Sequence, residues 1–158
     1  MLNTNNRRKA KIGAILASII FLLGADRVLK YWALTSLYHQ KINIIKNFFT
    51  LELWQNENIA FSVYLPQAAI MAGITAIVAS LSVLLISRTV KQPRRFGSLD
   101  WGILFIIIGA LSNLYDRLQF GFVVDYFNLA FLPVFNVADM MISIGAIVLG
   151  LALWQGKR

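Results

Sequence analysis

The carboxylates of Asp125 and Asp139 are the side chains of this sequence best suited to chemistry, because neither has a lysine or arginine within four positions. Asn136 precedes Asp139 by one helical turn and could orient its carboxylate by hydrogen bonding. Two carboxylates in a site of low dielectric constant cannot both ionise cheaply, so one keeps a proton. The ionised group can then take a proton from water while the protonated group polarises a peptide carbonyl, as in aspartic proteases. Peptide hydrolysis is therefore one function that this pair could serve.

Two further groups of polar residues have helical spacing. Asn113, Asp116 and Arg117 stand at i, i+3 and i+4 and share one helix face, where they either contribute to a site or satisfy neighbouring structural groups. Asp26 and Lys30 stand at i and i+4, which favours a structural ion pair at the membrane interface with a snorkelling lysine.

These polar residues belong to a chain that is otherwise strongly apolar. Hydrophobic residues make up 58% of the 158 positions, and the mean hydropathy is +0.67, which indicates an integral membrane protein. An acidic residue inside a membrane is costly and by default suggests a functional site. The acidic residues could alternatively carry protons or ions in a small transporter or channel subunit that is not an enzyme. The chain lacks the Gly/Pro-broken mid-membrane helices that transporters use, which argues against this alternative.

Composition also excludes several kinds of site. The chain has no cysteine and a single histidine, His39, which argues against a cysteine nucleophile, a zinc site and a Ser-His-Asp triad. We expect neither a metal nor a cofactor. The net charge of +8 does not indicate nucleic acid, because ten of the fifteen basic residues lie before the first apolar run, between the second and third, or at the C-terminus. The positive-inside rule places those three segments in the cytoplasm.

Four apolar runs have the length of a membrane span, and we expect helices at about 12–37, 66–87, 101–118 and 133–154. The first run could instead be a cleaved signal peptide, but its pattern continues through Lys30 to Trp32, which favours an uncleaved helix. The sequence thus predicts an all-α membrane protein that forms one domain, 1–158, with both termini in the cytoplasm.

The segments between the runs predict smaller elements. The stretch NIIKNFFTLELW suggests one or two short strands, and GFVVDYFNLAFL suggests an extended or re-entrant segment. Pro66 is expected to open the second helix, and Ser98 or Asp100 to cap the third.

Counting about 1.5 Å of rise per residue along each helix brings three acidic residues to one depth. Asp26, Asp116 and Asp139 all fall in the outer third of the bilayer, and the short connection from Asp139 lets Asp125 fold into the same layer. Convergence of acidic residues from three helices predicts one site near the extracytoplasmic surface.

Five motifs in a fixed order resemble the lipoprotein signal peptidases, also called signal peptidase II. They are DRVLK (26–30), NENIAFS (56–62), SNLYDR (112–117), GFVVDYF (121–127) and FNVAD (135–139), and the resemblance covers nearly the whole chain. A tetrapeptide GxGD, typical of another class of intramembrane aspartyl protease, is absent.

The resemblance implies an intramembrane aspartyl endopeptidase of the bacterial cytoplasmic membrane. Such enzymes cleave prolipoproteins just before a diacylglyceryl-modified cysteine, so the expected partners are these substrates and membrane lipid, and we expect a monomer. The resemblance assigns catalysis to Asp125 and Asp139 and a β platform outside the cytoplasm to the segment 43–62. Supporting or substrate-contacting roles fall to Asp26, Lys30, Asn56, Asn113, Asp116, Arg117, Asn136 and Ala138.

The chain departs from the family pattern at several places. Arg27 stands where the family usually has glutamine, and Ser112 stands where it usually has glycine. Asn58 and Ile59 replace a glycine-alanine pair, Met140 replaces a serine, and the stretch between the two aspartates is shorter than usual. These differences bear on substrate contacts and loop shape and leave both carboxylates in place.

Overall fold

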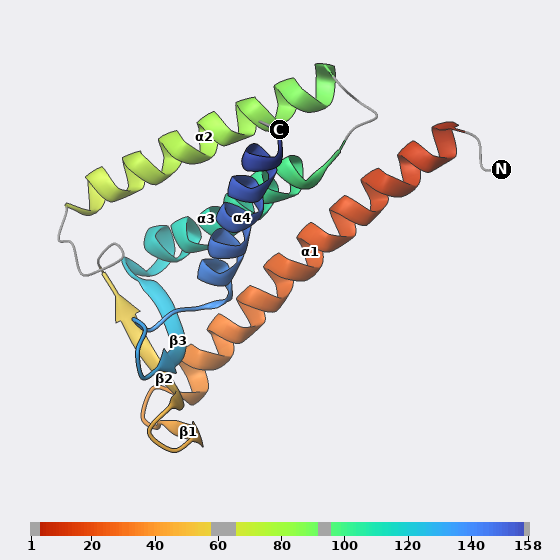
Figure 1. Ribbon diagram of the computed structural model, residues 1–158. Helices are drawn as coiled ribbons and strands as arrows, with labels where there is room; N and C mark the ends of the chain where they lie inside the picture. Colours follow the sequence, from red (N-terminus) through yellow and green to blue (C-terminus); the bar gives the residue numbers. More distant parts are fainter. Residues whose placement is uncertain (1–3, 58–65, 92–95, 157–158) are drawn as a thin grey trace.

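A computed structural model describes residues 4–57, 66–91 and 96–156. Its helices are α1 (Thr4–Ser36), α2 (Gln67–Lys91), α3 (Ser98–Phe120) and α4 (Val137–Gln155), and its strands are β1 (Ile42–Ile45), β2 (Phe49–Asn56) and β3 (Val123–Leu129). All four helices are long and apolar enough to cross a membrane. The strands form a small sheet at one end of the helices (Figure 1). The predicted class, a helical membrane protein with a small sheet, is confirmed.

The helix ends differ from the predicted ones. α1 begins at Thr4, ahead of the apolar run, and only its part from Ile12 is apolar enough to span a membrane. α2 begins after Pro66, as expected, but continues to Lys91. α3 starts at Ser98 with Gly97 as its N-cap, so Ser98 is not the cap. The carboxylate of Asp100 accepts the Gly97 N–H at 2.9 Å from inside the first turn.

The N-terminus of α4 lies at Val137, although the sequence suggested a start near Pro133. Phe135 instead pairs with Phe127 in an antiparallel bridge, which keeps the chain extended up to Asn136. The side chain of Asn136 then accepts the N–H of Asp139 at 2.9 Å and caps the helix. Asp139 therefore lies in the first turn of α4.

Glycines bring α3 and α4 into direct backbone contact. A Cβ atom on Gly109 would lie 2.4 Å from the carbonyl oxygen of Ala138, and one on Gly145 would lie 2.7 Å from that of Gly102. Such distances leave no room for a side chain, and small residues are what allow membrane helices to approach so closely. The α3–α4 pair is thus the centre of the bundle, and Leu104 of α3 packs in one cluster with Ala138 and Met141 of α4.

The sheet has the strand order β1-β2-β3, and both strand pairs are antiparallel. In the β2–β3 register, Trp54 lies opposite Asp125 and Asn56 lies opposite Val123. The platform expected from residues 43–62 therefore has a third strand from another part of the chain, and residues 58–62 of the expected segment lie outside the described residues. Ala33 of α1 and Leu37, just after its C-terminal end, pack against Val124 of β3, which joins the sheet to the bundle.

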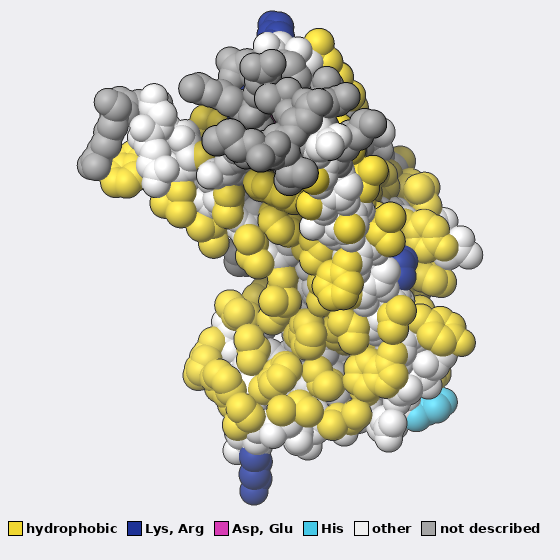
Figure 2. Space-filling view, turned by 90° about the vertical axis from the view of Figure 1, so that its right-hand side faces the viewer, with side chains coloured by type: hydrophobic (Ala, Val, Ile, Leu, Met, Phe, Trp, Pro, Cys, Tyr) yellow, Lys and Arg dark blue, Asp and Glu magenta, His cyan; other side chains and the backbone are white. Residues whose placement is uncertain are grey.

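Apolar side chains cover much of the outer surface, as Figure 2 shows for one face. On the helices, large residues such as Phe21, Val83 and Ile147 are exposed outward. An apolar exterior around buried charges is the arrangement expected of a helical bundle in lipid.

Candidate active site

Asp125 and Asp139 come from β3 and from the first turn of α4, and Asn136 contacts both. The side-chain amide of Asn136 donates to Oδ1 of Asp125 at 2.5 Å, and its main-chain N–H donates to Oδ2 of Asp139 at 3.1 Å. The orienting role predicted for Asn136 toward Asp139 agrees with these contacts, while its bond to Asp125 did not follow from the sequence. A single residue thus fixes how the two carboxylates lie relative to each other.

Each carboxylate also has a second amide donor. Asn56, at the end of β2, donates to Oδ2 of Asp125 at 2.9 Å, and Asn113 of α3 donates to Oδ1 of Asp139 at 2.7 Å. The site is therefore assembled from β2, β3, α3 and α4. Asparagine amides hold carboxylates in place without neutralising them, which suits groups that must exchange protons.

Burial sets the protonation of Asp125, whose side chain is only 1% exposed. Its pKa is raised to about 7, mainly by burial and secondly by the nearby charge of Asp139, while hydrogen bonds from Asn56 and Asn136 and the charge of Lys30 partly oppose the shift. Near neutral pH a large fraction of Asp125 therefore carries a proton. This is the condition that an aspartyl pair needs for acid and base work.

A cluster of four charged residues lies beside the pair and links α1 to α3. Asp116 binds Nη1 of Arg27 and Nζ of Lys30, each at 2.6 Å, and Asp26 binds Nη2 of Arg27 at 2.9 Å. Lys30 lies 3.5 Å from Asp26. The snorkelling expected for Lys30 is wrong, because its side chain is 2% exposed and points into the cluster.

The cluster also reaches the backbone next to each member of the pair. Oδ2 of Asp116 accepts the N–H of Val124 at 3.2 Å, and Oδ1 of Asp26 accepts the N–H of Ala138 at 3.0 Å. These residues immediately precede Asp125 and Asp139. In the part of the chain that the structure describes, Asp116 forms ion pairs with Arg27 and Lys30 of α1.

Lys30 connects the cluster to the pair through a side chain. Its ammonium donates to Oδ1 of Asn113 at 2.8 Å, which leaves the amide nitrogen of Asn113 to donate to Asp139. Arg27 and Ser112 are the members of this network that the sequence did not identify as site residues. Helical spacing could not reveal them, because their contacts run between α1 and α3.

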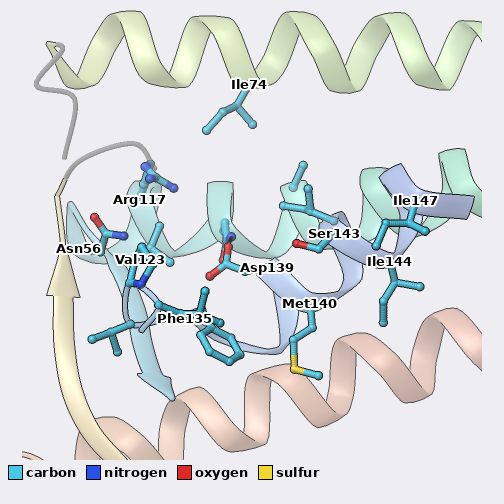
Figure 3. Close-up of a pocket in the computed structure, with 16 residues that line it drawn as sticks. Asn56, Ile74, Arg117, Val123, Phe135, Asp139, Met140, Ser143, Ile144 and Ile147 are labelled. Atoms are coloured by element: carbon cyan, nitrogen blue, oxygen red, sulfur yellow. Dashed lines mark hydrogen bonds between the residues drawn. The ribbon is translucent and has the colours of Figure 1, made fainter. Parts of the chain in front are cut away.

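A cavity of about 670 Å³ opens beside the pair. Asn56, Arg117 and Asp139 form its polar end (Figure 3), Asn113 also lines it, and the rest is mainly apolar. The apolar lining comes mostly from α2, α4 and the loop before α4, with Ala110 of α3 and Val123 of β3, and it includes Ile74, Phe135, Met140, Ile144 and Ile147. Asp125 is not among these lining residues, and Asn56 and Asn136 each donate to one of its oxygens. Asp139 is thus the member of the pair that faces the cavity.

Residues 18–155 match the family described as Signal peptidase (SPase) II. The chain belongs to this family. Its relatives include lipoprotein signal peptidases of Clostridium novyi (strain NT), 35% identical over 88% of this chain and 97% of that protein. Another, from Halothermothrix orenii, is 36% identical over 91% and 96%, and one from Clostridioides difficile (strain 630) is 39% identical over 83% and 88%.

Two solved structures share the fold. Both are described as bacterial membrane enzymes, determined by the in meso method at 2.3 Å and 1.9 Å resolution. The first has a TM-score of 0.79 at 24% identity and covers 92% of this chain and 90% of its own. The second has a TM-score of 0.74 at 25% identity, with coverage of 90% and 93%.

Membership of the signal peptidase II family confirms the resemblance seen in the five motifs. The chain is a peptidase and a multi-pass bacterial membrane protein, and the transporter alternative is not supported. The signal-peptide alternative for the first run fits poorly with the site, because Asp26, Arg27 and Lys30 of α1 complete the charged cluster.

Proposed function

We propose that this chain removes the signal peptide from diacylglyceryl-modified prolipoproteins by cleaving before the modified cysteine, with Asp125 and Asp139 as its catalytic pair. One observation carries this assignment: Asn136 binds both carboxylates at the polar end of an apolar cavity. The names of the relatives, lipoprotein signal peptidases, support the choice of substrate.

The chemistry divides between the two carboxylates according to their surroundings. Asp139 faces the cavity, so it takes a proton from a water molecule as the water oxygen attacks the peptide carbonyl carbon. Asp125, a large fraction of which carries a proton near neutral pH because its pKa is raised to about 7, donates its proton to the carbonyl oxygen. Asp139 then passes its proton to the amide nitrogen, the C–N bond breaks, and the proton of one hydroxyl of the intermediate returns to Asp125. All atoms and protons balance, and the net reaction is hydrolysis.

The shape of the cavity supports entry of substrate from the lipid. Ile74 of α2 and Ile144 and Ile147 of α4 line its apolar side (Figure 3). Among residues 4–57, 66–91 and 96–156, α2 packs mainly against α3, and its contacts with α4 are few. An apolar opening at membrane depth suits a helical signal peptide and its acyl chains better than a soluble peptide.

We further propose that the site faces the extracytoplasmic side, that both termini are cytoplasmic, and that the protein acts as a monomer without a metal. Arg88 and Lys91 lie in the last turn of α2, at the end opposite the sheet (Figure 1). By the positive-inside rule that end is cytoplasmic and the sheet lies outside. The pair of carboxylates and a water molecule suffice for hydrolysis, so the proposed mechanism needs no metal.

The test uses purified protein in detergent with one prolipoprotein in two forms, before and after diacylglyceryl modification. We expect cleavage of the modified form only, and mass spectrometry should place the cut immediately before the modified cysteine. Asp125→Asn protein serves as the inactive control. Equal rates on the two forms would remove lipid recognition from the proposal.

A further inference from the structure

The first turn of α4 is held by side chains from outside the helix. The first N–H groups of any helix have no partner within it. Here Asn136 accepts the Asp139 N–H, Asp26 of α1 accepts the Ala138 N–H at 3.0 Å, and the Tyr126 hydroxyl accepts the Val137 N–H at 3.4 Å. Asp26 is the one charged acceptor among the three, and an anion is favoured at a helix N-terminus. It is therefore the strongest tie between α1 and the turn that carries Asp139.

The other oxygen of Asp26 has its own partners. Nη2 of Arg27 donates to Oδ2 of Asp26 at 2.9 Å, and the hydroxyl of Ser112 donates to the same oxygen. Arg27 also donates to the hydroxyl and to the carbonyl oxygen of Ser112. Arg27, Ser112 and Asp26 thus form a closed triangle, and Asp26 is fully buried within it.

Lys30 is not a close partner of Asp26. Its ammonium lies 2.6 Å from Asp116 and 2.8 Å from Asn113 but 3.5 Å from Asp26. Arg27 and Ser112 are therefore the close partners of Oδ2 of Asp26. The guanidinium of Arg27, whose side chain is 31% exposed, lies 5.0 Å from the ring centroid of Tyr115, which provides a cation–π contact.

We propose that Arg27 and Ser112 are positioning residues for the hydrolytic reaction. Together they fix the carboxylate of Asp26, which fixes the N–H of Ala138 and thereby the direction in which Asp139 points. The catalytic part of this inference rests on the function proposed above for Asp139. The geometric part, that Arg27 and Ser112 hold the first turn of α4, does not depend on the substrate.

Three variants test the inference: Arg27→Met, Ser112→Ala and the double variant. We expect kcat per folded protein to fall about tenfold in each single variant, as is usual when a group that orients a reacting residue is lost, with KM unchanged. The double variant should be little worse than Arg27→Met, because both residues act through one oxygen. Amide hydrogen exchange at Ala138 and Asp139 should become faster in all three.

Arg88→Met is the matched control. Arg88 donates to the buried carboxylate of Asp100 at 2.7 Å, so this variant also removes an arginine–aspartate pair, but in the α2–α3 region near Gly97. It should lower the midpoint of thermal unfolding while kcat per folded protein and exchange at Ala138 stay unchanged. Arg27→Lys keeps the charge but loses the forked donor, and should give a kcat between those of Arg27→Met and the unchanged protein.

Several results would overturn the inference. An unchanged kcat in folded Ser112→Ala protein would overturn it. Ser112→Ala removes only a hydroxyl and no charge, so it remains informative even if Arg27→Met does not fold. Unchanged amide exchange at Ala138 would refute the geometric part, and a loss of activity explained wholly by unfolding, as in Arg88→Met, would refute the catalytic part. If the unchanged protein cleaves no prolipoprotein, the proposed function fails, and the exchange measurements still decide the geometric part.

Discussion

Asn136 binds both carboxylates of the proposed catalytic pair, so removing either should remove the proposed chemistry. Asp125→Asn and Asp139→Asn keep the size and much of the hydrogen bonding of each side chain but cannot share a proton. We expect each to abolish cleavage while the protein still folds, and the double variant to be hardly worse than either single one. Activity per folded protein, with folding followed by thermal unfolding in detergent, measures this.

Asp116→Asn is the control for the Asp125 and Asp139 variants, because it changes a buried carboxylate outside the proposed catalytic pair. It weakens contacts with Arg27, Lys30 and the Val124 N–H, and breaking a buried ion pair typically costs about 3–5 kcal/mol of stability. Its main effect should be a lower unfolding temperature rather than a lost chemical step. Substantial turnover by folded Asp125→Asn or Asp139→Asn protein would return Asp116 and Asp26 to the list of candidate catalytic acids.

The raised pKa of Asp125, about 7, predicts how activity and stability depend on pH. As pH rises through 7 the proton on Asp125 is lost, so kcat should fall on the alkaline side. Its pKa is higher in the folded than in the unfolded protein, so its contribution to stability is complete below the unfolded pKa of about 3.9 and is lost as pH rises toward 7.

Asp125→Asn isolates that contribution, because asparagine does not titrate. The unfolding temperature of Asp125→Asn relative to the unchanged protein should increase between about pH 4 and pH 7 and then level off. Thermal unfolding of both proteins across that range gives the difference. If the difference in unfolding temperature stays constant with pH, burial does not raise the pKa of Asp125.

The sequence predicts the two carboxylates and Asn136 better than it predicts their supports. Asp125 and Asp139 stand out because nothing basic is near them in the chain, and Asn136 stands out by its helical spacing. The partners of Lys30 and the contacts of Arg27 depend on how α1 packs against α3, and no local spacing encodes that. Polar contacts between residues far apart in the chain therefore cannot be predicted from the sequence pattern and require the fold.

Gly109 lies at the α3–α4 contact, where we expect a substitution to lower both stability and activity. A Cβ there would meet the carbonyl oxygen of Ala138 at 2.4 Å, so Gly109→Ala must push the first turn of α4 away from α3. We expect a lower unfolding temperature together with a lower kcat per folded protein, since Asp139 moves with that turn. Thermal unfolding and single-turnover cleavage measure the two effects.

Gly24→Ala is its control, because a Cβ at Gly24 of α1 would meet nothing within 4 Å. In a helix, alanine is favoured over glycine by about 1 kcal/mol, so this variant should be at least as stable as the unchanged protein and fully active. If both glycine variants behave alike, close contact between the backbones of α3 and α4 is not what the site needs.

The elements themselves were predictable to different degrees. Apolar runs of membrane length were enough for the four helices, and β-branched and aromatic residues for β1 and β2. The start of α4 could not be predicted from the sequence. Proline is a favoured opening residue, which suggested Pro133, whereas the pairing of Phe135 with Phe127 sets the real start. β3 was expected to be extended, but its pairing with β2 joins segments far apart in the chain.

The sheet and the end of α2 lie at opposite ends of the molecule (Figure 1), so its orientation in the membrane can be tested directly. Reporter fusions after Asn47, in the β1–β2 turn, and after Lys91, at the end of α2, should report opposite sides, with Lys91 cytoplasmic. The sheet lies at one end of the helices (Figure 1), and its residues Asn56 and Val123 line the cavity. If both fusions report the same side, the proposed extracytoplasmic location of the site fails with the topology.

The closed triangle of Arg27, Ser112 and Asp26 has a consequence for how this enzyme can change over evolutionary time. An exchange of Arg27 alone leaves a buried hydroxyl and carboxylate short of a donor, and an exchange of Ser112 alone leaves the guanidinium short of an acceptor. Either single step is therefore penalised until the second has occurred. Positions 27 and 112 should be inherited as a pair among relatives, although 85 positions of sequence separate them.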